Sequence, residues 1–483
     1  MPSKRSIARG GVRILAGVIG VAVAAGALVG AALVPLPTLR VTPPAAKVTP
    51  VAADQQRVCP GGLLDLADAT DASSLSSIGS PSITTDASTS ITQRSLKTPN
   101  VSGGGAPRVI ATQSKNGGER PLIAGAQSQN ATEADIAGLA ASSCGEATSD
   151  GWLVAGATTL GATSLIMLSN PSAVQATVDL TVYTEAGQAE APGARGLVVR
   201  AQSQLVVPLA GIVPNAQASV VHVQASGGSV LASLQQSTVQ GLAPQGVELV
   251  GPTATPAKHL VIPGMTVANV ARAAGGAEGA SSSLPSVRLL VPGTTEAHVT
   301  VTATSETDAG IVGTQSITLQ GGTVREVTFD HLIDGAYTVR VASDQPVVAA
   351  ARTVDAAATK SGGSATEQAE AATQDFAWFV ASAPLLDRTL LAVPSGASPK
   401  LHLVNDSDMD ATVKVSETGG STHSVTVASG KAVAVAVSAQ QTYTLDGTKG
   451  LRASVSLTAD AASSAFALNP PGPLAQPIVV YPK

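Results

Sequence analysis

The stretch from Gly151 to Gly187, GWLVAGATTLGATSLIMLSNPSAVQATVDLTVYTEAG, decides the fold. Between Val178 and Tyr183 an apolar residue alternates with a polar or aromatic one. A period of two places one face of a strand on a core and the other face in water. The Asn170-Pro171 pair that precedes this strand favours a turn. The stretch therefore predicts antiparallel strands joined by short turns.

Parts of the stretch recur further along the chain. Trp152-Leu-Val-Ala-Gly-Ala157 is matched by Trp378-Phe-Val-Ala-Ser-Ala383, and Leu168-Ser-Asn170 is matched by Leu403-Val-Asn405. A less faithful copy begins at Leu290. Repeats of about 100 to 120 residues have the size of one β-sandwich domain. The predicted fold is all-β, with tandem antiparallel, Ig-like sandwiches after an N-terminal transmembrane helix.

Composition shifts and turn residues divide the chain into segments. The first three are a cytoplasmic basic tail and signal anchor at 1–37, a Pro/Thr-rich stalk at 38–56, and a Cys-bridged, Ser/Gly-rich segment at 57–150. The others are β-sandwiches at 151–252 and 259–355, a linker at 356–375, and a third sandwich with a C-terminal strand at 376–483. Segment 57–150 has few large apolar residues, so we expect it to add strands to the neighbouring sandwich. Within it, residues 71–92 are expected to form a loop.

The N-terminus combines basic residues with a long apolar run. Residues 14–34 carry no charge and follow four Lys or Arg residues. A helix of this length is about 31 Å long, which is enough to cross a bilayer core. Basic residues before a span keep the N-terminus in the cytoplasm. We therefore expect a single-pass cell-membrane protein, anchored through 14–34, with its bulk extracytoplasmic. A signal peptide cleaved near 27–32 is the alternative, and it exports the remainder as well.

The charge balance bears on the class of partner. Charged residues make up 13% of the chain, and the formal net charge is −5. A protein that binds nucleic acid needs clustered Lys and Arg to neutralise phosphates. We therefore expect no nucleic-acid partner.

The chain has two cysteines, Cys59 and Cys144. In an extracytoplasmic protein an even number of cysteines favours a disulfide, and two unpaired thiols are the alternative. A bridge over this separation would stabilise the fold by roughly 4 to 5 kcal/mol in the chain-entropy description.

One acidic stretch resembles a metal-binding loop. Asp406, Asp408, Asp410 and Glu417 occupy positions 1, 3, 5 and 12 of an EF-hand calcium loop. Position 6, where that loop requires glycine, is Ala411, and the flanks have the pattern of strands. A solvated acidic turn is therefore the preferred interpretation, with a weak calcium site as the alternative. No other metal and no cofactor are expected.

Other candidate groups lack the spacing of a known site. The six histidines include no H-x-x-x-H pair, and no G-x-S-x-G motif is present. Trp152 and Trp378 could form a surface that stacks on a sugar, but aromatic residues at strand starts are usually core anchors. Three further carboxylates are conceivable acids without an evident partner: Asp179, Glu185 and Asp334. No catalytic residue is assigned.

The pattern resembles the β-sandwich repeats of secreted bacterial surface proteins. More closely, it is similar to an uncharacterised actinobacterial family with an N-terminal membrane segment, known only as a domain of unknown function. The residues that carry this resemblance are Cys59-Pro-Gly, Cys144, Trp152-Leu-Val-Ala-Gly, Leu168-Ser-Asn-Pro171 and Phe376-Ala-Trp378. The resemblance implies a fold and an exported location, and it implies no site residues.

Two classes of function follow from these observations. The preferred hypothesis is a non-enzymatic, membrane-anchored protein that scaffolds or binds a cell-envelope protein or polysaccharide. The alternatives are a hydrolase or transferase that acts on the envelope, or an accessory subunit of a membrane transport or glycosyltransferase complex.

Overall fold

The computed structural model describes residues 17–27, 46–48, 54–66, 75–114, 120–269, 284–307, 311–356, 374–470 and 478–480. They belong to two compact units, Met1–Pro50 with Leu474–Lys483, and Val51–Pro473. In the first unit residues 17–27 are helical, and β1 (Ala46–Val48) pairs antiparallel with β35 (Ile478–Val480). No helix in the described ranges is long and apolar enough to cross a membrane. The rest of the expected span, 14–34, lies outside the described residues.

The second unit is all-β, and its clearest part, residues 150–250, has two antiparallel sheets. One sheet contains β11 (Asp150–Val154), β17 (Ser219–Ser226) and β13 (Ala176–Thr184), with β14 (Gly187–Gln188) and β15 (Leu197–Val199) on β13. The other has the order β16 (Ser203–Pro208), β12 (Ala162–Asn170), β18 (Leu231–Gln240), β19 (Ala243–Val250). Two 3₁₀ turns, η1 (Pro192–Ala194) and η2 (Leu209–Gly211), lie between strands. The alternation predicted for 178–183 is observed, since β13 alternates buried and less buried residues.

Residues 257–380 repeat this arrangement around one long strand, β25 (Gly335–Ala356). Its first half pairs with β20 (Ala257–Val267) and β22 (Ala297–Ser305), and β22 also pairs with β23 (Ile311–Leu319). Its second half pairs with β21 (Ser286–Leu290) and β26 (Gln374–Val380), and β21 also pairs with β24 (Val324–Thr328). Strand β26, which the sequence placed at the start of the last sandwich, thus completes a sheet of this repeat.

Residues 388–467 form the next repeat. One sheet has the order β27 (Arg388–Ala392), β32 (Thr442–Asp446), β29 (Ala411–Glu417), β30 (Thr422–Val427). The other has the order β31 (Ala432–Ala436), β28 (Lys400–Val404), β33 (Arg452–Ala459), β34 (Ala462–Ala467). Trp152 and Trp378 do not occupy equivalent positions. Trp152 lies on the first strand of the repeat at 150–250, and Trp378 lies on the last strand of the repeat at 257–380.

Residues 55–143 form a repeat of their own instead of adding strands to a neighbour. Its two main sheets are β2 (Gln55–Cys59), β8 (Arg108–Thr112), β6 (Ile91–Ser95) and β5 (Ser82–Ala87), β9 (Ile123–Thr132), β10 (Ala137–Ser143). A small third sheet contains β3 (Leu64–Leu66), β4 (Leu75–Ser77) and β7 (Val101–Ser102). The expectation of a loop at 71–92 is wrong for the described part, 75–92, because β4, β5 and the start of β6 lie there. The segment can form sheets because small residues pack closely, with Ala126 and Ala140 fully buried.

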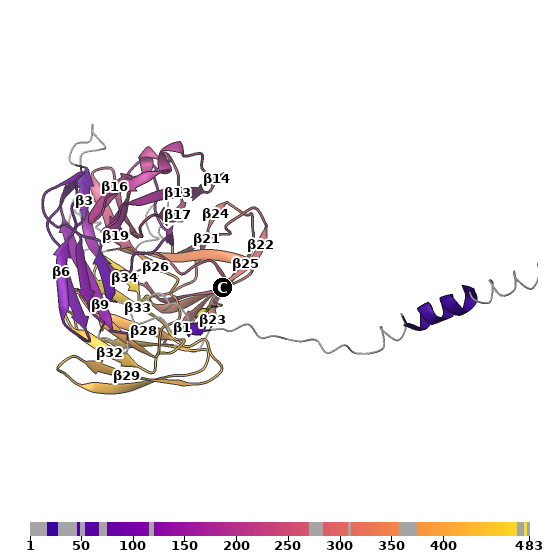
Figure 1. The fold of residues 1–483 in the computed structure, drawn as a ribbon. Coiled ribbons are helices and arrows are strands. Elements are labelled where there is room, and N and C mark those ends of the chain that lie inside the picture. The colour runs from indigo at the N-terminus through magenta and orange to yellow at the C-terminus, as the bar shows by residue number, and fades with distance from the viewer. Residues whose placement is uncertain are drawn as a thin grey trace, which may run out of the picture. The chain divides into compact units, whose positions relative to one another are not determined.

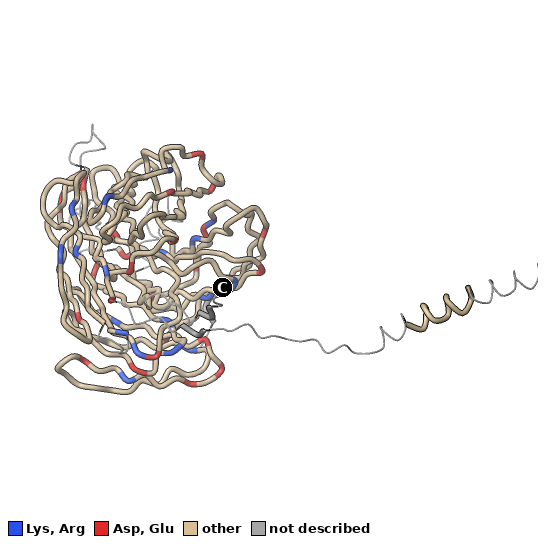
Figure 2. The backbone as a smooth tube through the Cα atoms, in the orientation of Figure 1, with Lys and Arg blue, Asp and Glu red and all other residues tan. Residues whose placement is uncertain are grey.

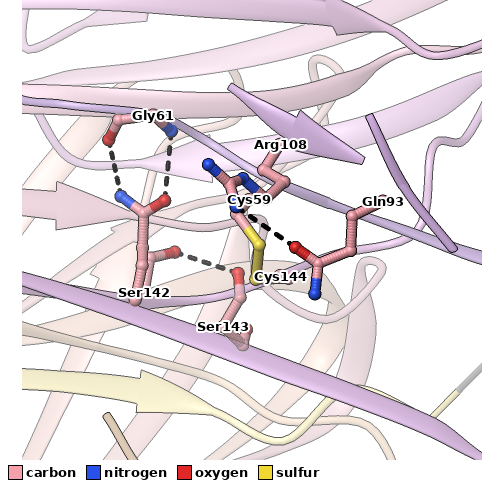
Figure 3. Close-up of a disulfide and its surroundings, with 8 residues drawn as sticks. Cys59, Gly61, Gln93, Arg108, Ser142, Ser143 and Cys144 are labelled. Carbon is pink, nitrogen blue, oxygen red and sulfur yellow. Dashed lines mark hydrogen bonds between the residues drawn. A yellow bond between two sulfur atoms is a disulfide. The ribbon is translucent and has the colours of Figure 1, made fainter. Parts of the chain in front are cut away.

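The predicted disulfide is present and closes this repeat. Cys59, at the end of β2, is bonded to Cys144, directly after β10, with an S–S distance of 2.04 Å. Figure 3 shows the bridge with Arg108 and Gln93 beside it, joined by a hydrogen bond of 3.2 Å from Arg108 Nη1 to Gln93 Oε1. The bridge therefore ties the first strand of the repeat to the segment that follows its last strand.

We number the repeats first (55–143), second (150–250), third (257–380) and fourth (388–467). In each, the last strand is an edge strand of its sheet: β10, β19, β26 and β34. These four edge strands pack on one another at the centre of the larger unit, where Figure 1 shows β19, β26 and β34 gathered together. An edge strand has backbone N–H and C=O groups that no neighbouring strand pairs. At this centre those groups need other hydrogen-bond partners.

Side chains join each repeat to the next and the fourth to the first. Gln235 bonds both backbone groups of Leu64, at 2.8 and 2.7 Å. Buried Arg288 donates to the carbonyl of Gly156 at 2.7 Å. The third and fourth repeats meet through Glu306 and His402, and the first and fourth through Ser128 and Ser395, whose Oγ atoms are 2.9 Å apart. The repeats thus form a closed ring. In Figure 2 acidic and basic residues are interspersed around it.

Candidate functional site

The acidic stretch at 406–417 consists of a turn at 406–410 and strand β29, and its carboxylates bind different partners. Asp406 pairs with Arg340 at 3.1 Å and lies 3.6 Å from Arg452, and Asp410 accepts the backbone N–H of Ser429 at 2.9 Å. Asp408 is exposed, and Glu417 ends strand β29. Within the described ranges no three His, Cys, Asp or Glu side chains lie close enough to hold a metal ion. The arrangement is that of a hydrogen-bonded turn.

An asparagine clasp explains why this turn resembles the one after Asn170. Asn405 donates to the carbonyls of Met409 and Val427 at 2.8 and 3.0 Å and accepts the N–H and hydroxyl of Ser407. Asn170 makes the same set of contacts, to Val174, Val199 and Ser172. The predicted equivalence of Asn170 and Asn405 is therefore confirmed at the level of individual hydrogen bonds.

Both tryptophans are buried. The Trp152 ring stacks on His222, with centroids 4.0 Å apart, and His222 Nε2 lies 2.8 Å from Asp150. Trp378 is 1% exposed and donates its indole N–H to Gln236 at 3.0 Å. The guanidinium of Arg288 lies 4.6 Å from the centre of the Trp378 ring. Both rings are packed in the core, and neither presents a free face for a sugar.

The three carboxylates considered as possible catalytic acids, Asp179, Glu185 and Asp334, do not form a common site. Asp179 accepts the N–H of Gly196 at 2.7 Å, and Glu185 accepts the N–H groups of Gln217 and Ala218. Asp334 is exposed in the turn before β25. The first two stabilise surface loops of the second repeat, and Asp334 belongs to the third.

The fold instead assembles a Ser–His–Glu relay that sequence reasoning missed. His402, on β28, places Nδ1 2.6 Å from Glu306 Oε2 and Nε2 2.8 Å from Ser456 Oγ. The three residues come from two repeats, because Glu306 follows β22. A serine hydroxyl, an imidazole and a carboxylate in this order can activate the hydroxyl as a nucleophile.

The relay is enclosed. His402 is fully buried and Ser456 is 2% exposed. The backbone of Gly264 lies directly on the imidazole, since a Cβ built there would be 2.4 Å from the ring. A pocket of about 240 Å³ lies over Glu306 and is also lined by Arg340 and Lys431, and Ser456 is not among its lining residues. Burial opposes ionisation of Glu306, but the charge of His402 and three hydrogen bonds outweigh it and lower the pKa of Glu306.

Two fully buried carboxylates lie where the four edge strands meet. Asp375, on β26, accepts the backbone N–H groups of Leu139, Val247, Ser463 and Phe376 at 2.8 to 3.2 Å. It thus binds all four edge strands, and each of its oxygens accepts two donors. The close approach requires glycine beside it. A Cβ at Gly138 or Gly246 would lie 2.5 or 2.6 Å from Asp375 Oδ1, and both residues have positive φ.

Glu248, on β19, is the second carboxylate of this centre. Its Oε1 accepts the Ser464 hydroxyl at 2.7 Å and the backbone N–H of Leu249 at 2.9 Å, whereas Oε2 has no partner. Burial raises the pKa of Glu248, and the nearby Asp375 raises it further. Burial also raises the pKa of Asp375, against the effect of its four backbone donors. Both carboxylates are buried, and their hydrogen bonds are to backbone N–H groups and to the Ser464 hydroxyl.

A larger pocket, of about 570 Å³, lies where the fourth repeat meets the first. Its lining contains Asp86, Ala87, Ser88, Thr89, Arg120, Pro121, Leu122, Arg388, Leu390, Thr418 and Thr444. Burial lowers the pKa of Arg120, and the nearby Glu146 opposes this shift. Because it is open to solvent and carries two guanidinium groups, this pocket is the best candidate for a ligand site.

Comparison with known proteins gives a family and no activity. Residues 96–463 match a family described as "Family of unknown function (DUF5719)", which is more than half of the chain. No curated protein matches the sequence. Among solved structures, the chicken CNTN1 FN1–FN3 domains align with 67% of this chain and 99% of their own, at 8% identity and a TM-score of 0.09. A likeness at that score carries no argument about fold or function.

Proposed function

The chain belongs to DUF5719, a family of unknown function, and we propose that it is a non-enzymatic, extracytoplasmic scaffold that binds a cell-envelope component. In this proposal residues 14–34 anchor it in the cell membrane, and each two-sheet repeat is an Ig-like module. The single observation that carries the proposal is the closed ring of four repeats around the buried edge strands.

The ring suits a scaffold because its polar residues are committed to structure. Asp375 and Glu248 accept backbone N–H groups at the centre, and Arg288 and His402 join neighbouring repeats. Such a frame holds its surface loops and joints at fixed positions, which favours binding by limiting the entropy lost on association.

The disulfide supports an extracytoplasmic location. Cys59 and Cys144 are joined, and disulfides persist in oxidising compartments and are rare in the cytosol. The uncharged run at 14–34, after a basic N-terminus, supports export through the membrane.

Co-sedimentation tests the binding role. The purified full-length protein is mixed with isolated envelope, before and after removal of envelope polysaccharide. We expect sedimentation with untreated envelope. Loss of binding after removal of polysaccharide would identify a glycan ligand, and retained binding would identify a protein or lipid partner. Failure to sediment with either preparation would contradict the proposal.

The Ser456–His402–Glu306 relay favours a second candidate, a serine hydrolase. A fluorophosphonate probe reacts with activated serine hydroxyls and separates the two functions. A scaffold leaves Ser456 unlabelled, because the hydroxyl is buried and bonded to the imidazole. Labelling of the folded protein that disappears in Ser456→Ala would replace the scaffold proposal by the hydrolase.

A further inference from the structure

We propose that the pocket between the fourth and first repeats, here called the closing-joint pocket, binds an anionic sugar. This inference rests on the proposed binding function and names the chemical class of the envelope component. The ligand chemistry is a polyhydroxylated ring that carries a carboxylate or phosphate group.

The closing joint differs from the other joints described above. Gln235, Arg288 and His402 are buried side chains that hydrogen-bond across the other three joints. A smaller pocket, of about 240 Å³, lies over Glu306 at the joint of the third and fourth repeats. At the closing joint the first and fourth repeats contact through Ser128 with Ser395 and through Asp86, which accepts hydroxyls of the fourth repeat. A pocket of about 570 Å³ lies at the same joint. That volume lies within the range of small-molecule sites.

The pocket offers positive charge to a ligand. Arg120 comes from the first repeat and Arg388 from the fourth, and both line it. The side chain of Arg388 is 62% exposed, and its ion pair with Asp446 is therefore weakened by solvent. Guanidinium groups bind carboxylate and phosphate through paired N–H donors. An anion in the pocket would be bound from both repeats.

The acidic residue of the lining is already engaged. Asp86 accepts the hydroxyls of Thr418 and Thr442 at 3.1 and 2.9 Å and the backbone N–H of Ala87 at 2.8 Å. Its charge thus stabilises the joint itself. The exposed guanidinium of Arg388 can therefore attract a ligand anion.

The remaining lining matches a sugar ring. Pro121, Leu122 and Leu390 supply apolar surface, while Thr89 and Thr444 supply hydroxyl groups. A sugar has apolar C–H faces and a rim of hydroxyls, so a site that combines both surfaces matches it better than a site for a bare anion. The proposed ligand therefore needs both the ring and the negative charge.

Calorimetry with the purified full-length protein tests this site. The probes are glucuronate, glucose and inorganic phosphate. The variant is Arg388→Ala, which removes an exposed side chain, and the matched control is Arg200→Ala, an exposed arginine outside the pocket. We expect glucuronate to bind more tightly than either other probe. Arg388→Ala should weaken it by about tenfold or more, and Arg200→Ala should leave it unchanged.

Three outcomes would overturn the inference: no binding of glucuronate, equal binding of glucuronate and inorganic phosphate, or equal binding by the wild type and Arg388→Ala. Co-sedimentation separates this failure from failure of the proposed function. If Arg388→Glu still sediments with envelope as the wild type does, the scaffold role stands and the pocket is not its site. If the wild type does not sediment, the proposed function itself fails.

Discussion

The carboxylate of Asp375 accepts the backbone N–H of Leu139 at 2.8 Å, although 236 residues separate the two in the sequence. Through the same side chain Asp375 also binds Val247 and Ser463. One residue therefore satisfies edge-strand donors from every repeat. This explains how four edge strands can meet in a buried core without a continuous ladder between them.

Asp375→Asn should destabilise the protein. The amide keeps one acceptor oxygen, and its NH₂ group would face backbone donors that have lost their partner. Leaving buried backbone donors without an acceptor costs about 1 to 3 kcal/mol. Thermal unfolding followed by circular dichroism measures the loss. Asp408→Asn, at an exposed aspartate, is the control. Equal melting temperatures for the two variants would contradict the role of Asp375.

Glu248→Gln should stabilise the protein at alkaline pH, whereas Asp375→Asn should destabilise it. The folded state raises the pKa of Glu248, so it binds a proton more tightly than the unfolded chain does. The contribution of Glu248 to the stability of the fold is therefore fully present below the pKa of the unfolded chain, about 4.3. This contribution is lost as pH rises through the pKa of the folded state. We expect the variant to melt above the wild type at pH 8, with the difference shrinking toward pH 4. A difference that is the same at both pH values would contradict this linkage.

The stability contributed by the Glu306–His402 pair should be lost as pH falls, whereas that of Glu248 is lost as pH rises. The folded state lowers the pKa of Glu306, so its stabilising contribution is present above about pH 4.3 and is lost as pH falls through the folded pKa. Glu306→Gln leaves the buried imidazole of His402 without its carboxylate partner. The cost at pH 7 should be about 3 to 5 kcal/mol, and it should diminish in acid. Denaturant unfolding of each single variant and of the double variant with His402→Gln measures the coupling. Additive losses would show that the pair is not coupled.

The repeats that sequence reasoning found are those with large apolar strands. The Val178–Tyr183 alternation and the Asn170 and Asn405 turns are local features, and the structure bears them out. The repeat at 55–143 was missed because its strands contain Ala, Ser and Gly, such as AGLAASS in β10. Close packing against neighbouring repeats forms its core, and composition does not show such packing.

The buried polar groups could be predicted only in part. His402 interrupts the apolar strand KLHLV, and Glu248 interrupts GVELV, so both stand out as charged or titratable residues in core positions. Their partners are not evident from the sequence, because Glu306 lies 96 residues from His402 and Asp375 is the last residue of the segment predicted to be a linker, 356–375. The sequence match between Trp152 and Trp378 is misleading, because the two tryptophans lie on strands at different positions in their repeats.

Removal of the disulfide should loosen the first repeat. Cys59→Ser with Cys144→Ser frees a loop of 85 residues. We expect a loss of about 2 to 5 kcal/mol, measured by urea unfolding, and a similar loss for the wild type in reducing agent. Reducing agent should not affect the double variant further. Unchanged stability of the double variant would show that packing alone holds the repeat.

Closure of the ring is the central claim, and an engineered crosslink tests it most directly. Ser128 and Ser395 lie on the first and fourth repeats, 267 residues apart, with Oγ atoms at 2.9 Å. In the full-length protein, Ser128→Cys with Ser395→Cys should form a disulfide under mild oxidation, detected as a linked peptide by mass spectrometry. Ser128→Cys with Ser226→Cys, an exposed serine of the second repeat, is the control pair. We predict efficient linkage for the first pair and none for the control. No linkage of Ser128→Cys with Ser395→Cys, or equal linkage of both pairs, would contradict the closed ring.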